Sequence, residues 1–241
     1  MNAAPREPAE ASSALLEAIV ASLVVTACVT IASARLPEKY VATGVGFLFL
    51  AATWALVWRR DDSFVARSGL AFGGLVLPGK LDVRATARAG LRALGWALAF
   101  AAVTFVPFYF GWRYWWAPES GFSLTPRLSE ITNELAGQVV IIALPEEAFY
   151  RGYLQSRLDD VWPPRLRVAG ARIGPGLFVA SAIFAVGHLA TIHAPARLAV
   201  FFPALVFGWL RARTGGVGAS IAYHALCNVF SEALGRGYGV Y

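Results

Sequence analysis

The 241-residue chain is too apolar for a water-soluble globular domain, because 57% of its residues are hydrophobic, 15% are charged and the mean hydropathy is +0.56. Soluble domains carry about 25% charged residues. The basic residues behind the net charge of +6 cluster between apolar runs, which is typical of topology signals and not of a nucleic-acid surface. We therefore expect an integral membrane protein that is surrounded by a lipid bilayer and binds no nucleic acid.

Apolar runs recur along the chain. Three are free of charge and long enough, or nearly long enough, to cross a bilayer: 18–34, 41–58 and 93–112. Four shorter ones follow: 135–145, 173–187, 198–210 and 215–223. The pattern predicts an all-α fold, a polytopic integral membrane helical bundle of seven transmembrane helices, or eight if the segment 59–92 dips into the membrane. No linker or repeat divides the chain, so we expect a single membrane domain over 1–241.

The loops differ in charge. Arginines gather in the loops 59–92 and 151–172 and at Arg211 and Arg213, which all lie on the same side of the membrane when the helices are counted. The positive-inside rule makes that side cytoplasmic. The opposite loop, 113–134, is slightly acidic and begins in the aromatic sequence WRYWW, as expected at an outer membrane surface. We predict a multi-pass protein of the plasma (inner) membrane whose N-terminus is cytoplasmic.

The segment 81–92 carries a basic stripe. Arg84, Arg88 and Arg92 are spaced by four residues and share one face of a helix. This spacing predicts a helix that lies on the surface of an anionic bilayer. Scarce lysine beside abundant arginine and alanine is typical of a GC-rich bacterial genome.

The sequence ALPEEAFYR places two glutamates directly after an apolar run. A carboxylate in the middle of a membrane costs roughly 2.5–3.5 kcal/mol, so each needs a reason to be there. Glu147 and Arg151 are four residues apart on one helical face, which predicts a structural ion pair. Glu146 lies about 100° further round the helix and has no such partner nearby in sequence. Pro145 frees the carbonyl of Ile141, which could admit water locally.

Two histidines lie in later apolar runs. His188 closes FAVGH, and His224 opens HALCN, with Asn228 one turn later on the same face. If three helices meet, these groups converge on Glu146, and two hydrolytic routes are open. Glu146 could activate a water while imidazole or amide groups stabilise the oxyanion. Alternatively, Glu146, His188 and His224 could bind Zn²⁺ and attack through its water, in a site assembled across helices because HExxH is absent.

The three motifs together resemble a known family. EEAFYR fits EExxxR, FAVGH fits FxxxH and HALCN fits HxxxN/D, in the order of the CPBP intramembrane proteases, which comprise Rce1-type CAAX prenyl endopeptidases and bacterial bacteriocin-processing relatives. The resemblance covers about 130–235, the motif-bearing catalytic helices. It implies an active site within the bilayer in which Glu146 activates water, Glu147 and Arg151 support it, and His188, His224 and Asn228 complete it. Both zinc-dependent and metal-free glutamate mechanisms are proposed for the family.

The substrate implied by the resemblance is a membrane-associated protein or peptide. One similar bacterial subgroup, the myxosortases, is proposed to remove C-terminal sorting tails, and the composition is compatible with such a source. Two other functions stay open. One is a non-catalytic immunity or scaffold protein that keeps a degenerate site. The other is a proton-coupled transporter that uses Glu146 and the histidines as a relay, for which inverted repeats would be expected but none is evident.

Overall fold

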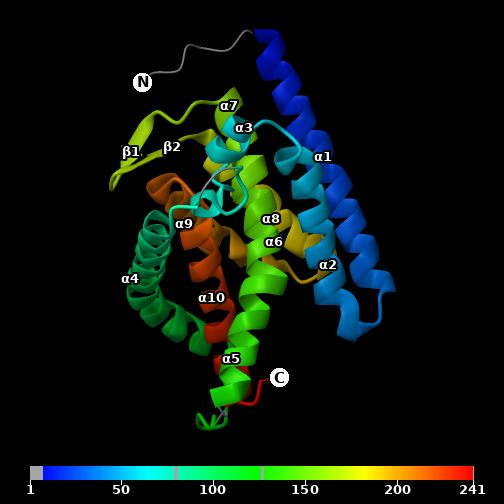
Figure 1. Ribbon diagram of the computed structural model, residues 1–241. Helices are drawn as coiled ribbons and strands as arrows, with labels where there is room; N and C mark the ends of the chain where they lie inside the picture. The colour runs from blue at the N-terminus through cyan, green and yellow to red at the C-terminus, as the bar shows by residue number, and fades with distance from the viewer. Residues whose placement is uncertain (1–7, 79–80, 126–127, 241) are drawn as a thin grey trace.

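The structure is a computed structural model that describes residues 8–78, 81–125 and 128–240. Long helices dominate it, with the N-terminal and C-terminal ends at opposite ends of the bundle (Figure 1). The elements are α1 (Pro8–Arg35), α2 (Glu38–Thr53), η1 (Trp54–Trp58), α3 (Asp62–Arg67), η2 (Phe72–Gly74), α4 (Val83–Trp116), α5 (Leu128–Gly137), η3 (Gln138–Ala143), α6 (Leu144–Glu147), η4 (Ala148–Leu154), α7 (Gln155–Val161), β1 (Leu166–Val168), β2 (Ala171–Ile173), α8 (Pro175–Thr191), η5 (Pro195–Val200), α9 (Phe201–Thr214) and α10 (Gly218–Gly237).

A single uninterrupted helix runs through the centre of the bundle. This central helix, residues 128–161, joins α5, η3, α6, η4 and α7, and both η3 and η4 are π-helical. Pro145 lies between the two π-helical stretches and cannot donate a hydrogen bond to the carbonyl of Ile141. Gly46 of α2 packs against that carbonyl, where a larger residue would collide with it. The absence of a side chain at Gly46 thus brings α2 close to the helix that carries both glutamates.

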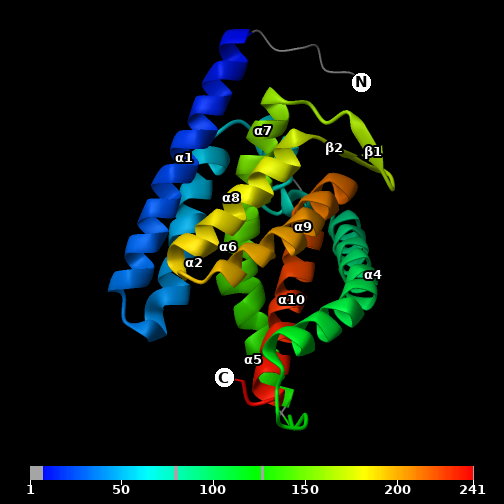
Figure 2. The same ribbon diagram turned by 180° about the vertical axis from the view of Figure 1, so that it is seen from behind.

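The other helices surround the central helix. α1 and α2 lie along one side of it, α8 and α9 pack across it, and α10 lies between it and the outermost helix, α4 (Figures 1 and 2). α4 is held to α10 by aromatic pairs, such as Phe105 stacked on Phe230 at 4.3 Å between ring centroids. Thr104 and Tyr223 add a hydrogen bond of 2.6 Å between the same two helices.

The expected helical membrane bundle is confirmed. The seven apolar runs fall largely within helices, namely α1, α2 with η1, α4, the central helix, α8, η5 with α9, and α10, although the runs 173–187 and 215–223 begin shortly before their helices. Within the described residues, four helices are long and apolar enough to cross a membrane: Glu10–Arg35, Glu38–Trp58, Val83–Trp116 and Pro195–Thr214. Large apolar side chains on the outside of the bundle are exposed, including Phe47 at 70% and Val103 at 72%, as expected for a surface that faces lipid.

Two local expectations need correction. The described part of segment 59–92 contains the short α3, the turn η2 and the start of α4, and no further long helix. The basic stripe does not form a separate surface helix, because Arg84, Arg88 and Arg92 occupy the first turns of α4. This helix is 34 residues long in all. Asp82 caps this helix, because its side chain accepts a hydrogen bond of 2.9 Å from the backbone N–H of Ala85. The cap favours a helix that begins at this point in the chain.

An antiparallel hairpin was not expected either. β1 and β2 are joined by Ala169 and Gly170, which both have positive φ angles, of 45° and 83°. A two-residue turn of this kind matches the twist of the paired strands, and glycine is suited to it. The hairpin projects from the end of the bundle at which α7 ends and α8 begins (Figure 2).

Ion pairs tie the helices together at the same end of the bundle. Glu17 of α1 pairs with Arg60 at 2.5 Å and with Arg157 of α7 at 2.6 Å. The hydroxyl of Tyr153 donates a third hydrogen bond to Glu17, at 3.2 Å. One carboxylate thereby joins the first helix, the chain after α2 and the central helix.

Candidate active site

Glu147 and Arg151 lie on the face of the central helix that is turned toward α9 and α10. Neither side chain is exposed, and Oε2 of Glu147 lies 3.4 Å from Nε of Arg151. The ion pair predicted from their spacing is therefore present. The guanidinium lies over the rings of Phe184 and Phe207, at 5.1 and 5.6 Å from their centroids, which are favourable cation–π distances. Within the described residues the guanidinium nitrogens make no hydrogen bond, so Glu147 is the carboxylate that balances the charge of Arg151.

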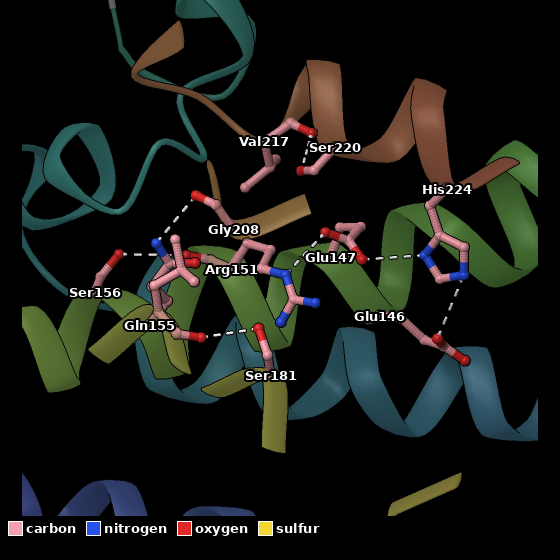
Figure 3. A network of polar contacts seen from close by, with 11 residues as sticks. Glu146, Glu147, Arg151, Gln155, Ser156, Ser181, Gly208, Val217, Ser220 and His224 are labelled. Carbon is pink, nitrogen blue, oxygen red and sulfur yellow. Dashed lines mark hydrogen bonds and ion pairs between the residues drawn. The ribbon is translucent and has the colours of Figure 1, made fainter. Parts of the chain in front are cut away.

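The other oxygen of Glu147 orients His224. Its Oε1 lies 3.0 Å from Nδ1 of the imidazole (Figure 3). An ionised carboxylate can only accept hydrogen bonds, so Nδ1 carries a proton. The imidazole is stacked on Phe207 at 4.7 Å between centroids and 15° between planes, which holds the orientation of the ring. Glu147 and Phe207 together direct Nε2 toward Glu146.

Glu146 approaches the same imidazole from the other side. Its Oε2 lies 3.9 Å from Nε2 of His224, which is too far for a direct hydrogen bond (Figure 3). Oε2 is buried and has no hydrogen-bond partner within the described residues. At this separation one water molecule can bond to both groups. The two glutamates and the histidine thus form a set in which one carboxylate positions the imidazole and the other remains available.

A cavity of about 480 Å³ lies beside Glu146. His188 also borders the cavity, and its Nδ1 lies 3.0 Å from the backbone oxygen of Phe184. A carbonyl oxygen only accepts, so the neutral ring carries its proton on Nδ1 and has Nε2 free. The rest of the lining comes mainly from α1, α2 and η3 and is largely apolar; it includes Val29, Val41, Val45, Phe49, Ile141 and Ile142. The cavity is of the size of ordinary ligand pockets, and the charged or titratable groups on its walls include Glu38, Glu146, His188 and Arg197.

Asn228 is the predicted site residue that lies apart. It does not border the cavity, and its Nδ2 donates a hydrogen bond of 2.8 Å to Oε1 of Gln138 in η3. Gln138 was not singled out in the sequence, although it is a polar residue within the apolar run 135–145. Of the six predicted residues, Glu146, Glu147, Arg151 and His224 are in contact or nearly so, and His188 shares the cavity with Glu146.

The residues considered for zinc do not fit a three-ligand site. Among the described residues, no group of three His, Cys, Asp or Glu side chains is arranged to hold a metal ion. Glu146 and His224 are close to each other, but Nδ1 of His224 is engaged with Glu147. A zinc site requires at least three protein ligands around one point, and Glu146, His188 and His224 do not supply them here.

Comparison with known proteins adds independent information. Residues 130–230 match the family described as type II CAAX prenyl endopeptidase Rce1-like. This part of the chain is similar to Rce1-like domains. The matched region contains all three sequence motifs and every predicted site residue. Rce1-like proteins are intramembrane proteases, so the match supports a peptidase that acts on a protein substrate. No curated protein and no solved structure gave a significant match.

Helices that precede the matched region in the chain also contribute to the cavity. α1 and α2 lie outside the matched residues but supply one wall of the cavity beside Glu146. No motif in the first 128 residues indicated this role, because the residues concerned are ordinary apolar side chains such as Val45 and Phe49. These side chains form part of the wall of the cavity that Glu146 borders, and so help to set its shape.

Proposed function

We propose that the protein is an intramembrane endopeptidase that hydrolyses a peptide bond in a membrane-associated protein. The observation that carries the proposal is the position of Glu146, a residue that borders the cavity and whose buried Oε2 lies 3.9 Å from Nε2 of the oriented imidazole of His224. A carboxylate in this position can act as a general base toward a water molecule. The match to the Rce1-like family supports the same reaction class.

In the proposed reaction, Glu146 and Nε2 of His224 hold the attacking water. As the water oxygen bonds to the carbonyl carbon of the scissile peptide, Glu146 takes one of its protons and the carbonyl electron pair moves onto the oxygen. The tetrahedral intermediate then collapses, the C–N bond breaks and Glu146 returns the proton to the departing nitrogen. The products are a carboxyl group and an amine. Glu147 stays outside these steps and keeps the imidazole of His224 in place.

The cavity and the family suggest the substrate class. Its walls are mostly apolar, which suits apolar side chains beside the scissile bond. The family is named for CAAX prenyl endopeptidases. For a bacterial chain, which generally meets no prenylated protein, we propose a C-terminal sorting tail as the segment removed. We further propose that the protein lies in the plasma membrane with its N-terminus and its arginine-rich end in the cytoplasm, as the charge distribution indicates.

Mapping of new C-termini tests the proposal. Membrane proteins would be compared between cells that express the wild type and cells that express Glu146→Gln, which keeps the size of the side chain and removes the base. The matched control is Glu134→Gln, on the same central helix, where the glutamate pairs with the exposed Arg236 and does not border the cavity. We expect C-termini that appear with the wild type and the control and are absent with Glu146→Gln. Equal cleavage by Glu146→Gln would contradict the proposal.

The metal question has a separate test. Metal content of the purified protein would be measured, and cleavage assayed with and without a chelator. The arrangement of the described residues predicts that cleavage survives the chelator, because no three-ligand group is present. If the purified protein contains stoichiometric zinc, and the chelator removes zinc and activity together, the result would show metal-dependent catalysis in place of metal-free glutamate catalysis. A phenotype that both Glu146→Ala and His224→Ala retain would instead favour a scaffold or immunity role.

A further inference from the structure

Tyr150 has a hydroxyl group in the cavity that no group of the protein uses. The residue follows Glu146 by one helical turn on the same face, borders the cavity, and is 3% exposed. Its hydroxyl makes no hydrogen bond within the described residues. Tyrosine hydroxyls usually find a partner when they are buried, and each exception calls for an explanation. A hydroxyl that faces a cavity next to a free carboxylate suggests a partner that arrives with the substrate.

The ring of Tyr150 is held from several sides. Its ring centroid lies 5.5 Å from that of Phe49 in α2 and 5.2 Å from that of its neighbour Phe149. It also packs edge-on against Phe184 of α8, with 4.9 Å between the centroids and 89° between the ring planes. These contacts leave the ring little freedom to rotate away. The hydroxyl is therefore placed before any ligand binds, which is the condition under which a donor contributes most to catalysis.

Space for the hydroxyl depends on Gly187. A Cβ atom at this position would lie 3.0 Å from the tyrosine oxygen, closer than such atoms normally approach. Gly187 immediately precedes His188 on α8, so the hydroxyl lies where the central helix and α8 meet at the cavity. The glycine thus allows Tyr150 to extend toward the histidine that borders the same cavity.

The proposed reaction also needs a hydrogen-bond donor. The oxyanion that forms on the scissile carbonyl requires donors, yet the two imidazoles carry their protons on Nδ1 when neutral and present Nε2 as an acceptor. The amide nitrogen of Asn228 donates to Gln138 and does not border the cavity. The hydroxyl of Tyr150 has a proton to donate and no other acceptor.

We propose that Tyr150 is a further catalytic residue, whose hydroxyl donates a hydrogen bond to the carbonyl oxygen of the scissile peptide and stabilises the oxyanion that forms there. This inference rests on the proposed endopeptidase function and adds a residue to it. The hydroxyl keeps its proton throughout, so the transfer of protons between water, Glu146 and the leaving nitrogen is unchanged. The role is therefore stabilisation of the negative charge that develops on the carbonyl oxygen.

The test is a mutant cycle with a substrate of known sequence. A synthetic peptide that spans a cleavage site mapped by the Glu146→Gln comparison would be cleaved by purified full-length enzyme. Tyr150→Phe removes only the hydroxyl, and we expect kcat to fall by about 10²–10³-fold while KM changes little. The matched control is Tyr153→Phe, because Tyr153 is a buried tyrosine of the same helix whose hydroxyl bonds to Glu17 away from the cavity. We expect it to keep the kcat of the wild type.

Gly187→Ala provides an independent route to the same defect. Its added methyl group displaces the hydroxyl, so we expect a loss of kcat similar to that of Tyr150→Phe. Once the hydroxyl has been removed, the methyl group has less to collide with, and the double variant should be no slower than Tyr150→Phe alone. Losses that multiply would show that Gly187 acts through another group and would overturn this part of the proposal.

The outcomes separate this inference from the proposed function. If Glu146→Gln is inactive while Tyr150→Phe has the kcat of the wild type, the endopeptidase stands and the role of Tyr150 is rejected. A fall in activity that merely follows a fall in folded protein, measured by thermal unfolding in detergent, also rejects it. If the wild type generates no C-terminus that depends on Glu146, the proposed function fails, and the role of Tyr150 fails with it.

Discussion

Two faces of the central helix each carry a glutamate with a polar partner four residues later, but the two faces have different surroundings. Glu147 and Arg151 are four residues apart and fully buried, and their charges are balanced by each other beneath two aromatic rings. Glu146 and Tyr150 have the same spacing, but both border a cavity, and Oε2 of Glu146 makes no hydrogen bond within the described residues. The comparison teaches that two adjacent glutamates can differ in role because about 100° of helical rotation separates a closed environment from an open one.

Loss of the arginine should have the largest effect on stability. Arg151→Ala leaves Glu147 buried without its counter-charge, which typically costs about 3–5 kcal/mol. We expect little folded protein to accumulate and a much lower midpoint of thermal unfolding in detergent. Glu146→Ala, on the open face, should unfold close to the wild type. Similar stabilities of the two variants would contradict the contrast between the faces.

Replacement of the whole buried pair should separate stability from activity. In Glu147→Gln/Arg151→Gln neither member of the buried pair is charged, so part of the stability lost in Arg151→Ala should return. Activity should still be lower than that of the wild type by about 10²-fold, since a neutral amide holds the proton of His224 on Nδ1 less firmly. Thermal unfolding and cleavage of the same preparation would measure both quantities. Full activity would show that the position of His224 does not depend on the charge of Glu147.

A second carboxylate–arginine contact, between Glu17 and Arg157, tests whether burial sets the size of the effect. Arg157→Ala removes one partner of Glu17, but this carboxylate keeps Arg60 and Tyr153 and its side chain is 26% exposed. We expect a loss of about 1–2 kcal/mol in unfolding free energy, well below that of Arg151→Ala. Thermal unfolding of the two arginine variants side by side provides the measurement. A loss as large as that of Arg151→Ala would mean that burial is not what distinguishes the sites.

The smallest expected effect depends on pH. Asp159 lies in α7 at the charged end of the bundle, outside the candidate membrane spans, where burial raises its pKa to about 6 and Arg211 only partly offsets the shift. A carboxyl whose folded pKa is raised contributes stability below its unfolded pKa, and this contribution is lost as the pH rises through about 6. Between pH 5 and pH 7 the wild type should lose roughly 1 kcal/mol in unfolding free energy from this group. Asp159→Asn should flatten that part of the profile, and an unchanged profile would exclude Asp159 as its source.

The sequence predicts the helices better than it predicts their lengths. Most of each apolar run lies in a helix because a chain surrounded by lipid must satisfy its backbone hydrogen bonds within the helix. The run 135–145 is short because charged residues follow it, but the central helix continues as far as Val161. Arg151 and Arg157 are tolerated in it because each meets a carboxylate inside the protein. That compensation comes from packing, and a hydropathy pattern does not contain it.

The contacts of the candidate site could likewise be predicted only in part from the sequence. The pair of Glu147 and Arg151 could be predicted because its spacing is local. The contact of Glu147 with His224 joins residues 77 positions apart, and that of Asn228 with Gln138 joins residues 90 positions apart. Both depend on how α10 lies against the central helix. Three motifs in order indicated that these segments meet, but only the packing shows that Asn228 turns away from the cavity while Tyr150 turns toward it.

The π-helical stretches on either side of Pro145 separate the length of the central helix from its rotational phase. A π-helical turn holds one residue more than the α-helical turn that it replaces. Deletion of the surplus residue within η4 would therefore let an ordinary α-helical turn form there and leave α7 in nearly the same rotational phase relative to Glu146. Arg157 would still face Glu17, whereas the same deletion in an α-helical stretch would turn α7 by about 100° and separate the two side chains. The central helix should therefore tolerate the loss of one residue within η4 better than the loss of one residue within α6 or α7.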